Sequence, residues 1–249
     1  MTEASFTAPS FAERRTWYLR GCGATFSVPG LILVSAFIGF ASLAKGAGLT
    51  AAQSVFMTGV VWALPAHVVL VGAILAGASL PAVMFAVTLS SVRLMPMVVA
   101  IVPELRGSRT PRWVLYALSH FVAVTSWVVA MERLKHVPRD LRTSYYLGLG
   151  STLVLGNMLV VAAFYLVADS LPPAVSAGLL LLTPMYFLAS LWGSARERAT
   201  HFAMVFGMVL GPAFHLFMPQ FDLVAAGVLG GGAAYALHRF SASRRTHDF

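Results

Sequence analysis

Residues 80 to 102 read LPAVMFAVTLSSVRLMPMVVAIV and form one apolar run with a single charge, Arg93. A helix needs about 20 such residues to cross the hydrocarbon core of a bilayer, so this run predicts a membrane-spanning helix. Across all 249 residues, 58% are hydrophobic and only 10% are charged. A soluble domain carries about 25% charged residues, so the composition indicates an integral membrane protein.

The same criterion of length finds eight candidate spans, each bounded by charge, Gly or Pro. They are residues 24–44, 52–76, 80–102, 113–131, 144–168, 173–193, 200–218 and 222–238. We therefore expect an all-α integral membrane protein with about eight transmembrane helices in one domain, residues 24–238. A polar cytoplasmic tail, residues 1–23, is expected before it and a basic cytoplasmic tail, residues 239–249, after it.

The basic residues predict an orientation, because cytoplasmic loops of membrane proteins are enriched in Lys and Arg. With eight spans and the N-terminus inside, 12 basic residues fall inside and four fall outside: Lys45, Arg106, Arg109 and Arg112. The exception is the segment ELRGSRTPR (104–112), which is basic and is expected outside. A re-entrant neighbouring segment would explain it, so a seven-span model is the alternative.

Several expected spans contain prolines, among them Pro29, Pro65 and Pro96 in the first half of the chain and Pro184 and Pro212 in the second. A proline inside a helix frees a backbone carbonyl, which protein or trapped water must satisfy within a bilayer. The prolines are either simple kinks or marks of discontinuous helices. Their recurrence in both halves favours a transporter built from an inverted repeat.

Arg93 lies near the centre of its expected span, where a charge is costly and is expected to face the protein interior or a water-filled cavity. All nine Asp and Glu residues fall outside the expected spans, so no ion-pair partner is expected within the membrane. One interpretation is that Arg93 binds an anionic group of a ligand, such as a carboxylate, through a bidentate contact. The other is a structural arginine bonded to helix ends.

His67 follows Pro65 and also lies near the middle of its span. Its imidazole could contact a substrate or carry a proton, since an unperturbed histidine titrates near pH 6.5; alternatively it is an ordinary hydrogen-bond partner between helices. His120 and His215 are weaker candidates. Hydroxyls at Ser90, Ser91, Thr125 and Ser126 add polarity, although such groups commonly bond to their own helix backbone.

Other kinds of chemistry find little support in the sequence. The single cysteine excludes an intrachain disulfide, and no cluster with metal-ligand spacing is present. The nucleophile motif GxSxG is absent, and the basic residues fall mostly in loops and tails, as the positive-inside rule predicts. We expect no enzymatic activity, no cofactor or metal, and no nucleic-acid partner.

Three patterns resemble the AzlC family, the large subunit of branched-chain amino acid exporters. VPG (28–30) followed by GFASLAKGAGLT (39–50) is similar to the family's first span and its glycine-ended loop. WALPAHVV (62–69) lies where the family has a small-residue stretch ending in glutamine, which His67 would replace. SSVRLMPM (90–97) is similar to an Asn-Leu-Arg-His segment, with Arg93 kept, Ser91 at the asparagine position and Leu94 at the histidine position.

The resemblance implies a transporter subunit in a bacterial inner membrane that exports branched-chain amino acids or a related small amphipathic carboxylate, with proton coupling. It also implies a small hydrophobic partner subunit of the AzlD type. The expected substrate site comprises Arg93, Ser91, Ser90, His67, Pro29, Gly30, Thr125 and Ser126, with His67 as the proton-coupling candidate.

One departure from the family pattern keeps a second hypothesis open. Thr125 and Ser126 stand where the family usually has an Asp-Glu pair, so a site for an ammonium group or a proton would be lost. This loss favours an anionic ligand over a zwitterionic amino acid. It is also compatible with a membrane scaffold or sensor that retains the fold without transporting.

Overall fold

The computed structural model describes residues 9–194, 198–218 and 222–245, and throughout these ranges its regular structure is helical, without a strand. The chain divides into two compact units, residues 1–183 and 184–249. The ends of both expected tails, residues 1–8 and 246–249, and the basic residue Arg196 lie outside the described residues. The all-α prediction is confirmed for the part that is described.

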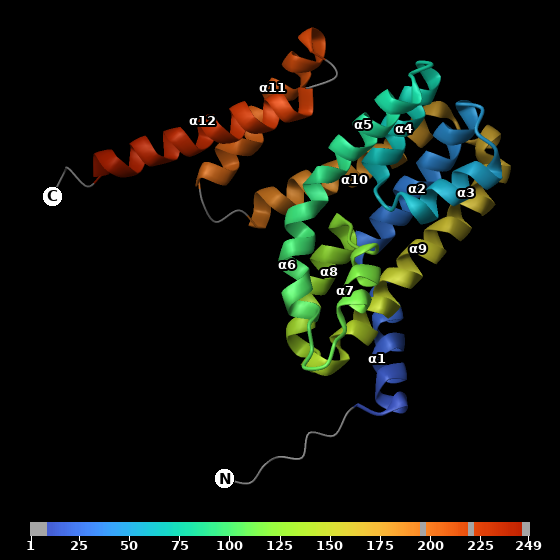
Figure 1. The fold of residues 1–249 in the computed structure, drawn as a ribbon. Helices are drawn as coiled ribbons and strands as arrows, with labels where there is room; N and C mark the ends of the chain where they lie inside the picture. The colour runs from blue at the N-terminus through green and yellow to red at the C-terminus, as the bar shows by residue number, and fades with distance from the viewer. Residues whose placement is uncertain (1–8, 195–197, 219–221, 246–249) are drawn as a thin grey trace. The chain divides into compact units, whose positions relative to one another are not determined.

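The first unit contains the segments that position the candidate site (Figure 1). Its helices are α1 (Phe11–Ala24), α2 (Val28–Gly46), α3 (Ala51–Val60), α4 (Leu64–Leu75), α5 (Leu80–Ser91), α6 (Met95–Leu105), α7 (Arg112–Ser119), α8 (Val124–Arg133) and α9 (Arg142–Val167). Short 3-10 turns lie at Val92–Leu94, Leu134–His136, Arg139–Leu141 and Ala168–Ser170. Helix α10 (Pro173–Ser194) begins in this unit and extends past its boundary.

Three helices of the first unit are long and apolar enough to cross a membrane: Val28–Gly46, Leu80–Leu105 and Arg139–Ser170. A fourth, Thr200–Phe217, belongs to the second unit, and these four are all that the described residues contain by this criterion. The expected count of eight is therefore not confirmed. The opening stretch, residues 80–102, does lie in one spanning helix, which passes through the 3-10 turn at Arg93.

Two of the expected spans are each divided into a pair of short helices. Residues 52–76 form α3 and α4 with a break at residues 61–63, and residues 113–131 form α7 and α8 with a break at residues 120–123. A helix rises about 1.5 Å per residue, so halves of eight to twelve residues reach only partway across the core. We call α3 with α4 the first hairpin and α7 with α8 the second hairpin, and the two breaks their tips.

The first hairpin starts at one end of the unit, where the α2–α3 loop, the α4–α5 loop and the end of α9 lie. We call it the apolar end, because Lys45 is the one Lys or Arg residue that the first unit has there. Lys45, at the close of α2, forms a 2.7 Å ion pair with Asp169, which follows α9. The hydroxyl of Tyr165 donates to the carbonyl of Leu49 at 2.6 Å, so the loop before α3 lies beside the end of α9. The hairpin also returns there, because α4 packs against α5 at the beginning of the spanning helix Leu80–Leu105.

Left-handed glycines terminate both helices at this apolar end. Gly48 follows α2 with φ +77°, and Gly77 follows α4 with φ +65°. In each case the next amide donates five residues back, from Leu49 to Ala44 and from Ala78 to Ala73, as in the Schellman motif. Residues with a Cβ are strained at such φ values, so these glycines define where the chain can turn.

The second hairpin starts and finishes at the opposite end, which we call the basic end. Arg142 bonds Glu104 at 2.7 Å, and the Arg139 guanidinium donates to the carbonyl of Arg106 at 3.1 Å. The amide and hydroxyl of Ser108 both donate to Asp140 at 2.9 Å. Residues 104–112 therefore lie beside residues 133–142. The expectation that Arg106, Arg109 and Arg112 are on the other side from residues 133–142 is wrong, because α7 and α8 return to the end where they begin.

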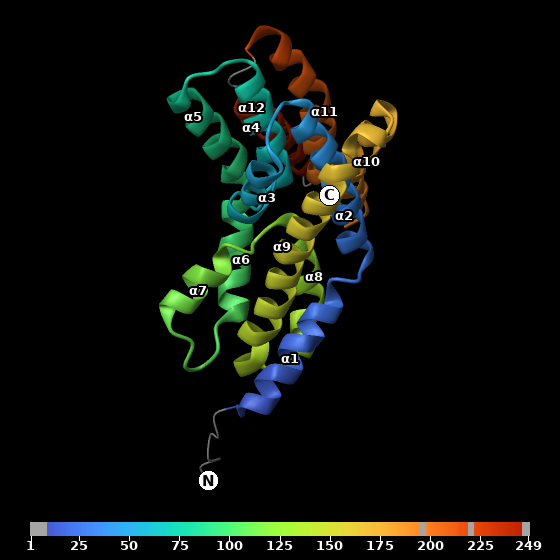
Figure 2. The same cartoon turned by 90° about the vertical axis from the view of Figure 1, so that its right-hand side faces the viewer.

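The same order of elements, a spanning helix followed by a hairpin, thus occurs twice in the first unit. The two copies run in opposite directions between the apolar end and the basic end. Helix α2 precedes a hairpin that enters from the apolar end, and the helix Leu80–Leu105 precedes a hairpin that enters from the basic end. Figures 1 and 2 show α4 and α5 at one end of the unit and α7 at the other. This order is the pattern that an inverted repeat produces.

Helices α1 and α9 hold the basic end together through close backbone packing. A Cβ on Gly21 would lie 2.0 Å from the carbonyl oxygen of Tyr145, and one on Gly148 would lie 2.1 Å from that of Tyr18. Small residues permit such an approach between helices. The expected N-terminal tail therefore includes a helix, α1, that packs on α9 as part of the first unit.

The second unit contains two helices that pack against each other, α11 (Arg198–Phe217) and α12 (Asp222–Arg245). Helix α11 continues through Pro212. Gly230 of α12 faces α11, where an added Cβ would lie 3.3 Å from the Cβ of Phe206. The expected spans 200–218 and 222–238 correspond to these two helices.

Candidate functional site

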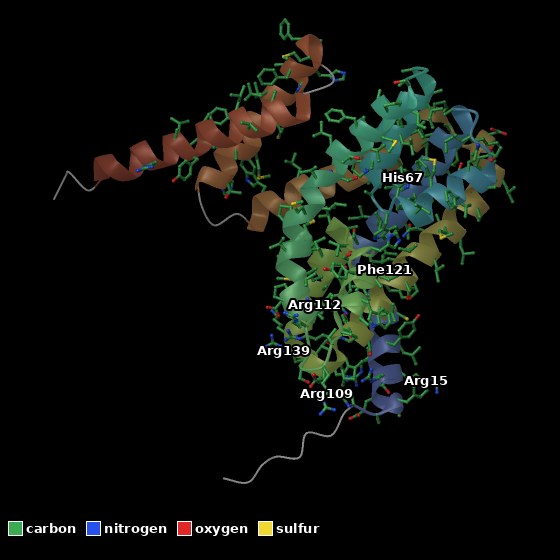
Figure 3. All side chains as sticks on the ribbon, in the orientation of Figure 1. Arg15, His67, Arg109, Arg112, Phe121 and Arg139 are labelled. Atoms are coloured by element: carbon green, nitrogen blue, oxygen red, sulfur yellow. The ribbon has the colours of Figure 1, made fainter. Side chains whose placement is uncertain are left out.

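The two hairpin tips meet inside the first unit. The indole Nε1 of Trp62, in the first tip, donates to the carbonyl oxygen of Phe121, in the second tip, at 3.2 Å. The Nε2 of His120 lies 3.0 Å from the carbonyl oxygen of Gly59, in the last turn of α3. Each tip thus supplies a side chain to the backbone of the other. Figure 3 shows His67 and Phe121, one from each hairpin, in the body of the unit.

These contacts satisfy the backbone groups that the breaks leave free. The last carbonyls of a helix have no partner within it, and in a bilayer an unsatisfied group costs several kcal/mol. At the end of α3, Gly59 is bonded by His120, and Met57 receives both the amide of Val61 and Nε2 of His67 at 3.0 Å. By bonding these carbonyls, His67 and His120 allow α3 to end within an expected membrane span.

His67 is fully buried and has one free acceptor. Its side chain has 0% exposure and contacts Phe37 and Phe40, whose ring centroids lie 5.7 and 4.8 Å from the imidazole. A carbonyl can only accept, so Nε2 carries the proton in the bond to Met57. Nδ1 is then an acceptor in the neutral ring, and it is buried without a partner. A buried orphan of this kind is costly unless something else bonds to it.

The second tip is closed by Ser126 in place of a histidine. Its hydroxyl lies 2.6 Å from the carbonyl oxygen of Phe121 and accepts from the amide of Ala123 at 2.9 Å, which satisfies the start of α8. The hydroxyl of Tyr146 lies 3.4 Å away. Thr125 and Ser126 are both buried. The start of α4 in the first tip has no such side-chain cap, and Pro65 occupies its first turn, where a proline is tolerated.

Arg93 lies at the midpoint of the spanning helix Leu80–Leu105, in the 3-10 turn between α5 and α6. The α5 half packs on α4, and the α6 half contacts α7 and α8, so Arg93 marks the passage from one hairpin to the other. Its side chain is exposed within the described structure and makes no ion pair or hydrogen bond with the residues described. Since a charge is not stable against lipid, this position requires a polar group from elsewhere.

The remaining expected site residues are distributed more widely. Ser90 is buried beside Arg93 in sequence, and Ser91 donates to the carbonyl of Val87 in its own helix at 2.8 Å. Pro29 and Gly30 belong to the first turn of α2, where Ser27 caps the Gly30 amide, and do not form a break within a span. The structure brings His67 and Ser126 to the paired tips, and places Pro29 and Gly30 at a helix start instead.

Several residues of the tips were not among the expected site residues. Trp62 connects the tips, and its ring stacks on Phe37 with centroids 5.9 Å apart and planes within 6°. Gly59 and Phe121 contribute only backbone, so residue type does not reveal them. A clue was available for Trp62, because its indole precedes the Ala-Leu-Pro sequence that opens α4 and a buried indole needs an acceptor.

Within the described ranges no group of three or more His, Cys, Asp or Glu side chains could hold a metal ion. The candidate site consists of two broken helices whose tips are joined by hydrogen bonds, together with the buried imidazole of His67. Discontinuous helices that form a site are characteristic of many membrane transport proteins.

The chain belongs to the AzlC family. The family model, described as AzlC protein, matches residues 29–171. The matched range covers all three spanning helices of the first unit up to the end of α9, together with both hairpins. No curated protein and no solved structure matches the chain. Family and apolar helices together identify a membrane protein, and the family indicates a function related to branched-chain amino acid transport.

Proposed function

We propose that this chain is a transporter subunit that exports branched-chain amino acids or a related small amphipathic carboxylate, and that it is not an enzyme. The observation that carries the proposal is the contact of two broken helices between oppositely directed repeats. Alternating access through rocking of one repeat against the other would require such a contact to open and close. Among the described residues, two hydrogen bonds join the hairpins at their tips, from Trp62 to Phe121 and from His120 to Gly59, and both would have to break.

The start of α4, Arg93 and side chains of α2 together supply the groups that a small amphipathic carboxylate requires. The start of α4 has no side-chain cap, so its backbone donors, favoured by the helix dipole, suit an anion. Arg93 adds a positive charge without a described partner. Phe37 and Phe40 would accept an aliphatic group, and Nδ1 of His67 could accept from a ligand ammonium. These assignments follow from the chemistry of the groups.

The carbonyls at the first break are not available to bind a ligand ammonium. Those of Met57 and Gly59 already accept from His67 and His120, so they support the break itself. We therefore assign ammonium recognition to the free Nδ1 of His67 and keep this residue as the proton-coupling candidate. Thr125, Ser126 and Ser90 are assigned to support of the site.

The proposed setting is a bacterial inner membrane with both termini cytoplasmic. Ten of the twelve Lys and Arg residues of the first unit belong to the start of the chain or to the loops at the basic end; they are Arg14, Arg15, Arg20, Arg106, Arg109, Arg112, Arg133, Lys135, Arg139 and Arg142. The positive-inside rule assigns the basic end to the cytoplasm.

A small hydrophobic subunit of the AzlD type is the proposed partner, since large apolar side chains such as Met84 and Met95 are exposed on the helix that carries Arg93.

Export can be measured as efflux of labelled leucine, isoleucine, valine and methionine from loaded cells that express the chain with a small partner subunit. Arg93→Gln is expected to reduce efflux to the background of cells without the chain, because the ligand's negative charge would lose its counter-charge. Lys135→Gln, which removes an equal charge from an exposed position at the basic end, is the matched control.

Membrane insertion of both variants is checked by the amount of protein in washed membranes. Unchanged efflux in a well-inserted Arg93→Gln variant would overturn the role of Arg93. Absence of efflux for every amino acid with the unaltered chain and its partner would favour the scaffold or sensor hypothesis, which the loss of the family's acidic pair at Thr125 and Ser126 motivates.

A further inference from the structure

A cavity with basic side chains in its lining lies at the basic end of the first unit. Its volume is about 130 Å³, and three separate segments enclose it: the start of α1, the loop before α7, and the turn before α9. The lining residues are Pro9, Arg14, Ser108, Arg109, Thr110, Pro111, Val114, Asp140 and Thr143. We propose that this cavity binds the phosphate headgroup of an anionic phospholipid.

The charge of the cavity suits a phosphate. Arg14 and Arg109 line it with a single acid, Asp140, so the lining carries a net positive charge. Asp140 is occupied by the amide and hydroxyl of Ser108, both at 2.9 Å. The charge of Arg109 interacts favourably with the Asp140 carboxylate, but Arg109 forms no ion pair with a described acid. Its planar guanidinium can therefore make bidentate contact with phosphate oxygens.

The surroundings strengthen this charge. Figure 3 shows Arg15, Arg109, Arg112 and Arg139 gathered at this end of the first unit. They come from α1, the loop before α7, α7 itself and the turn before α9. Basic pockets between transmembrane helices on the cytoplasmic side are the usual sites for anionic headgroups.

The depth of the cavity points to a lipid as the source of the phosphate. Helix α7 begins at the cavity wall with Arg112 and exposes Trp113 at 70% and Tyr116 at 77%. Exposed Trp and Tyr side chains concentrate at the headgroup level of a bilayer, where their rings are apolar and their polar atoms reach water. The cavity therefore lies where lipid phosphates are, and Val114 gives its wall an apolar portion.

A lipid bound here would join the second hairpin to α1 and α9. Thr110, Pro111 and Val114 belong to the approach and first turn of α7, whereas Arg14 belongs to α1 and Thr143 to α9. Occupation would favour the arrangement in which these segments lie together, because a ligand stabilises the state that binds it. This proposal does not depend on the identity of the transported solute.

The test uses the full chain in phosphatidylcholine nanodiscs with or without phosphatidylglycerol, and measures lipid retained after extraction into detergent by native mass spectrometry. We expect phosphatidylglycerol to be retained over phosphatidylcholine. Arg109→Gln and Arg14→Gln are each expected to lower its affinity roughly tenfold, the effect of losing one hydrogen bond to a charged group. Arg15→Gln is the matched control, since Arg15 is the exposed neighbour of Arg14 and does not line the cavity.

Equal retention of the two lipids, or an equal loss in the Arg14→Gln and Arg15→Gln variants, would overturn the proposal, because charge alone and not the cavity would then hold the lipid. Inorganic phosphate and glycerol phosphate form the second arm. If either displaces phosphatidylglycerol at millimolar concentration, the cavity is a site for a free anion and the lipid assignment is wrong. Failure of both to compete supports the lipid.

Discussion

The two hairpins have the same outline and different chemistry. In the first, imidazoles from His67 and His120 bond the carbonyls that end α3, and the start of α4 has no side-chain cap. In the second, the hydroxyl of Ser126 satisfies the start of α8 and approaches the carbonyl of Phe121. The start of the second half-helix therefore has a side-chain cap, whereas the start of α4 keeps uncapped donors. Each hairpin also has one buried nitrogen without a partner, Nδ1 of His67 in the first and Nε1 of Trp127 in the second. In the proposed function, this difference in capping places ligand binding at the first tip and structural support at the second.

The largest expected effect is a difference in the side of the membrane from which the loops that flank the two hairpins can be labelled. In a Cys22→Ser background, Ser108→Cys and His136→Cys are expected to react with a membrane-impermeant maleimide from the same side, and Ala78→Cys only from the opposite side. The second hairpin returns to the basic end, so the loops on either side of it share one compartment. If Ser108→Cys and His136→Cys reacted from opposite sides, residues 113–131 would cross the membrane and would not form a hairpin.

The next effect separates the structural and proton-coupling roles of His67. His67→Ala is expected to lower the free energy of unfolding by about 2–5 kcal/mol, because it empties a buried volume against Phe37 and Phe40 and frees the carbonyl of Met57. Denaturant unfolding of the purified protein in detergent gives this value.

His67→Gln provides the matched comparison, because the glutamine amide can still donate to the Met57 carbonyl and does not titrate. We expect it to recover most of the stability that His67→Ala loses, while efflux loses its dependence on external pH. A His67→Gln variant whose efflux follows pH as in the unaltered chain would exclude His67 as the proton carrier and leave its capping role intact.

A smaller effect is expected in the second hairpin. Ser126→Ala removes the acceptor for the amide of Ala123 and should cost about 1–3 kcal/mol of unfolding free energy. Ser126→Thr, which keeps the hydroxyl, is the control. If Ser126→Ala abolished efflux at full stability, the second tip would bind ligand and the assignment of the two tips would have to be reversed.

The smallest effect is expected where the hairpins touch. Trp62→Phe keeps an aromatic ring against Phe37 and removes the donor to Phe121. Hydrogen bonds between membrane helices contribute about 0.6 kcal/mol on average, with a maximum near 1.7, so stability should change by an amount in this range. If separation of the tips limits transport, the efflux rate should change clearly even though the free energy of unfolding changes little. An unchanged rate would indicate that the tips stay together during the cycle.

The sequence predicted the all-helical class of fold, and the limits of that prediction have a physical reason. Arg93 and His67 could be recognised because charge and imidazole are rare in apolar runs. Residues 113–131 could not be recognised as a hairpin by length, because two short apolar halves add up to the length of one span. The basic flanks on both sides, residues 104–112 and 133–142, were the available indication.

The contacts between the tips could not be predicted at all. Trp62 and Phe121 are 59 positions apart, and the acceptor is a backbone carbonyl that every residue has. Pro29 illustrates the opposite limit: a proline in an apolar run can indicate a kink or a break within a span, whereas in the structure Pro29 lies in the first turn of α2. Proline has no amide donor, so a break and a helix start are equally compatible with it.

The cross-tip bonds also bear on the order of assembly in the cell. Each hairpin has contacts of its own, from His67 to Met57 in the first and from Ser126 to Ala123 in the second, that need no other part of the chain. The carbonyl of Gly59, by contrast, receives its partner only when His120 has been synthesised and has reached the same depth. The first hairpin is therefore incomplete while the ribosome adds the next 61 residues. Until then it depends on water or another protein at the membrane, which makes this interval the vulnerable stage in the biogenesis of the protein.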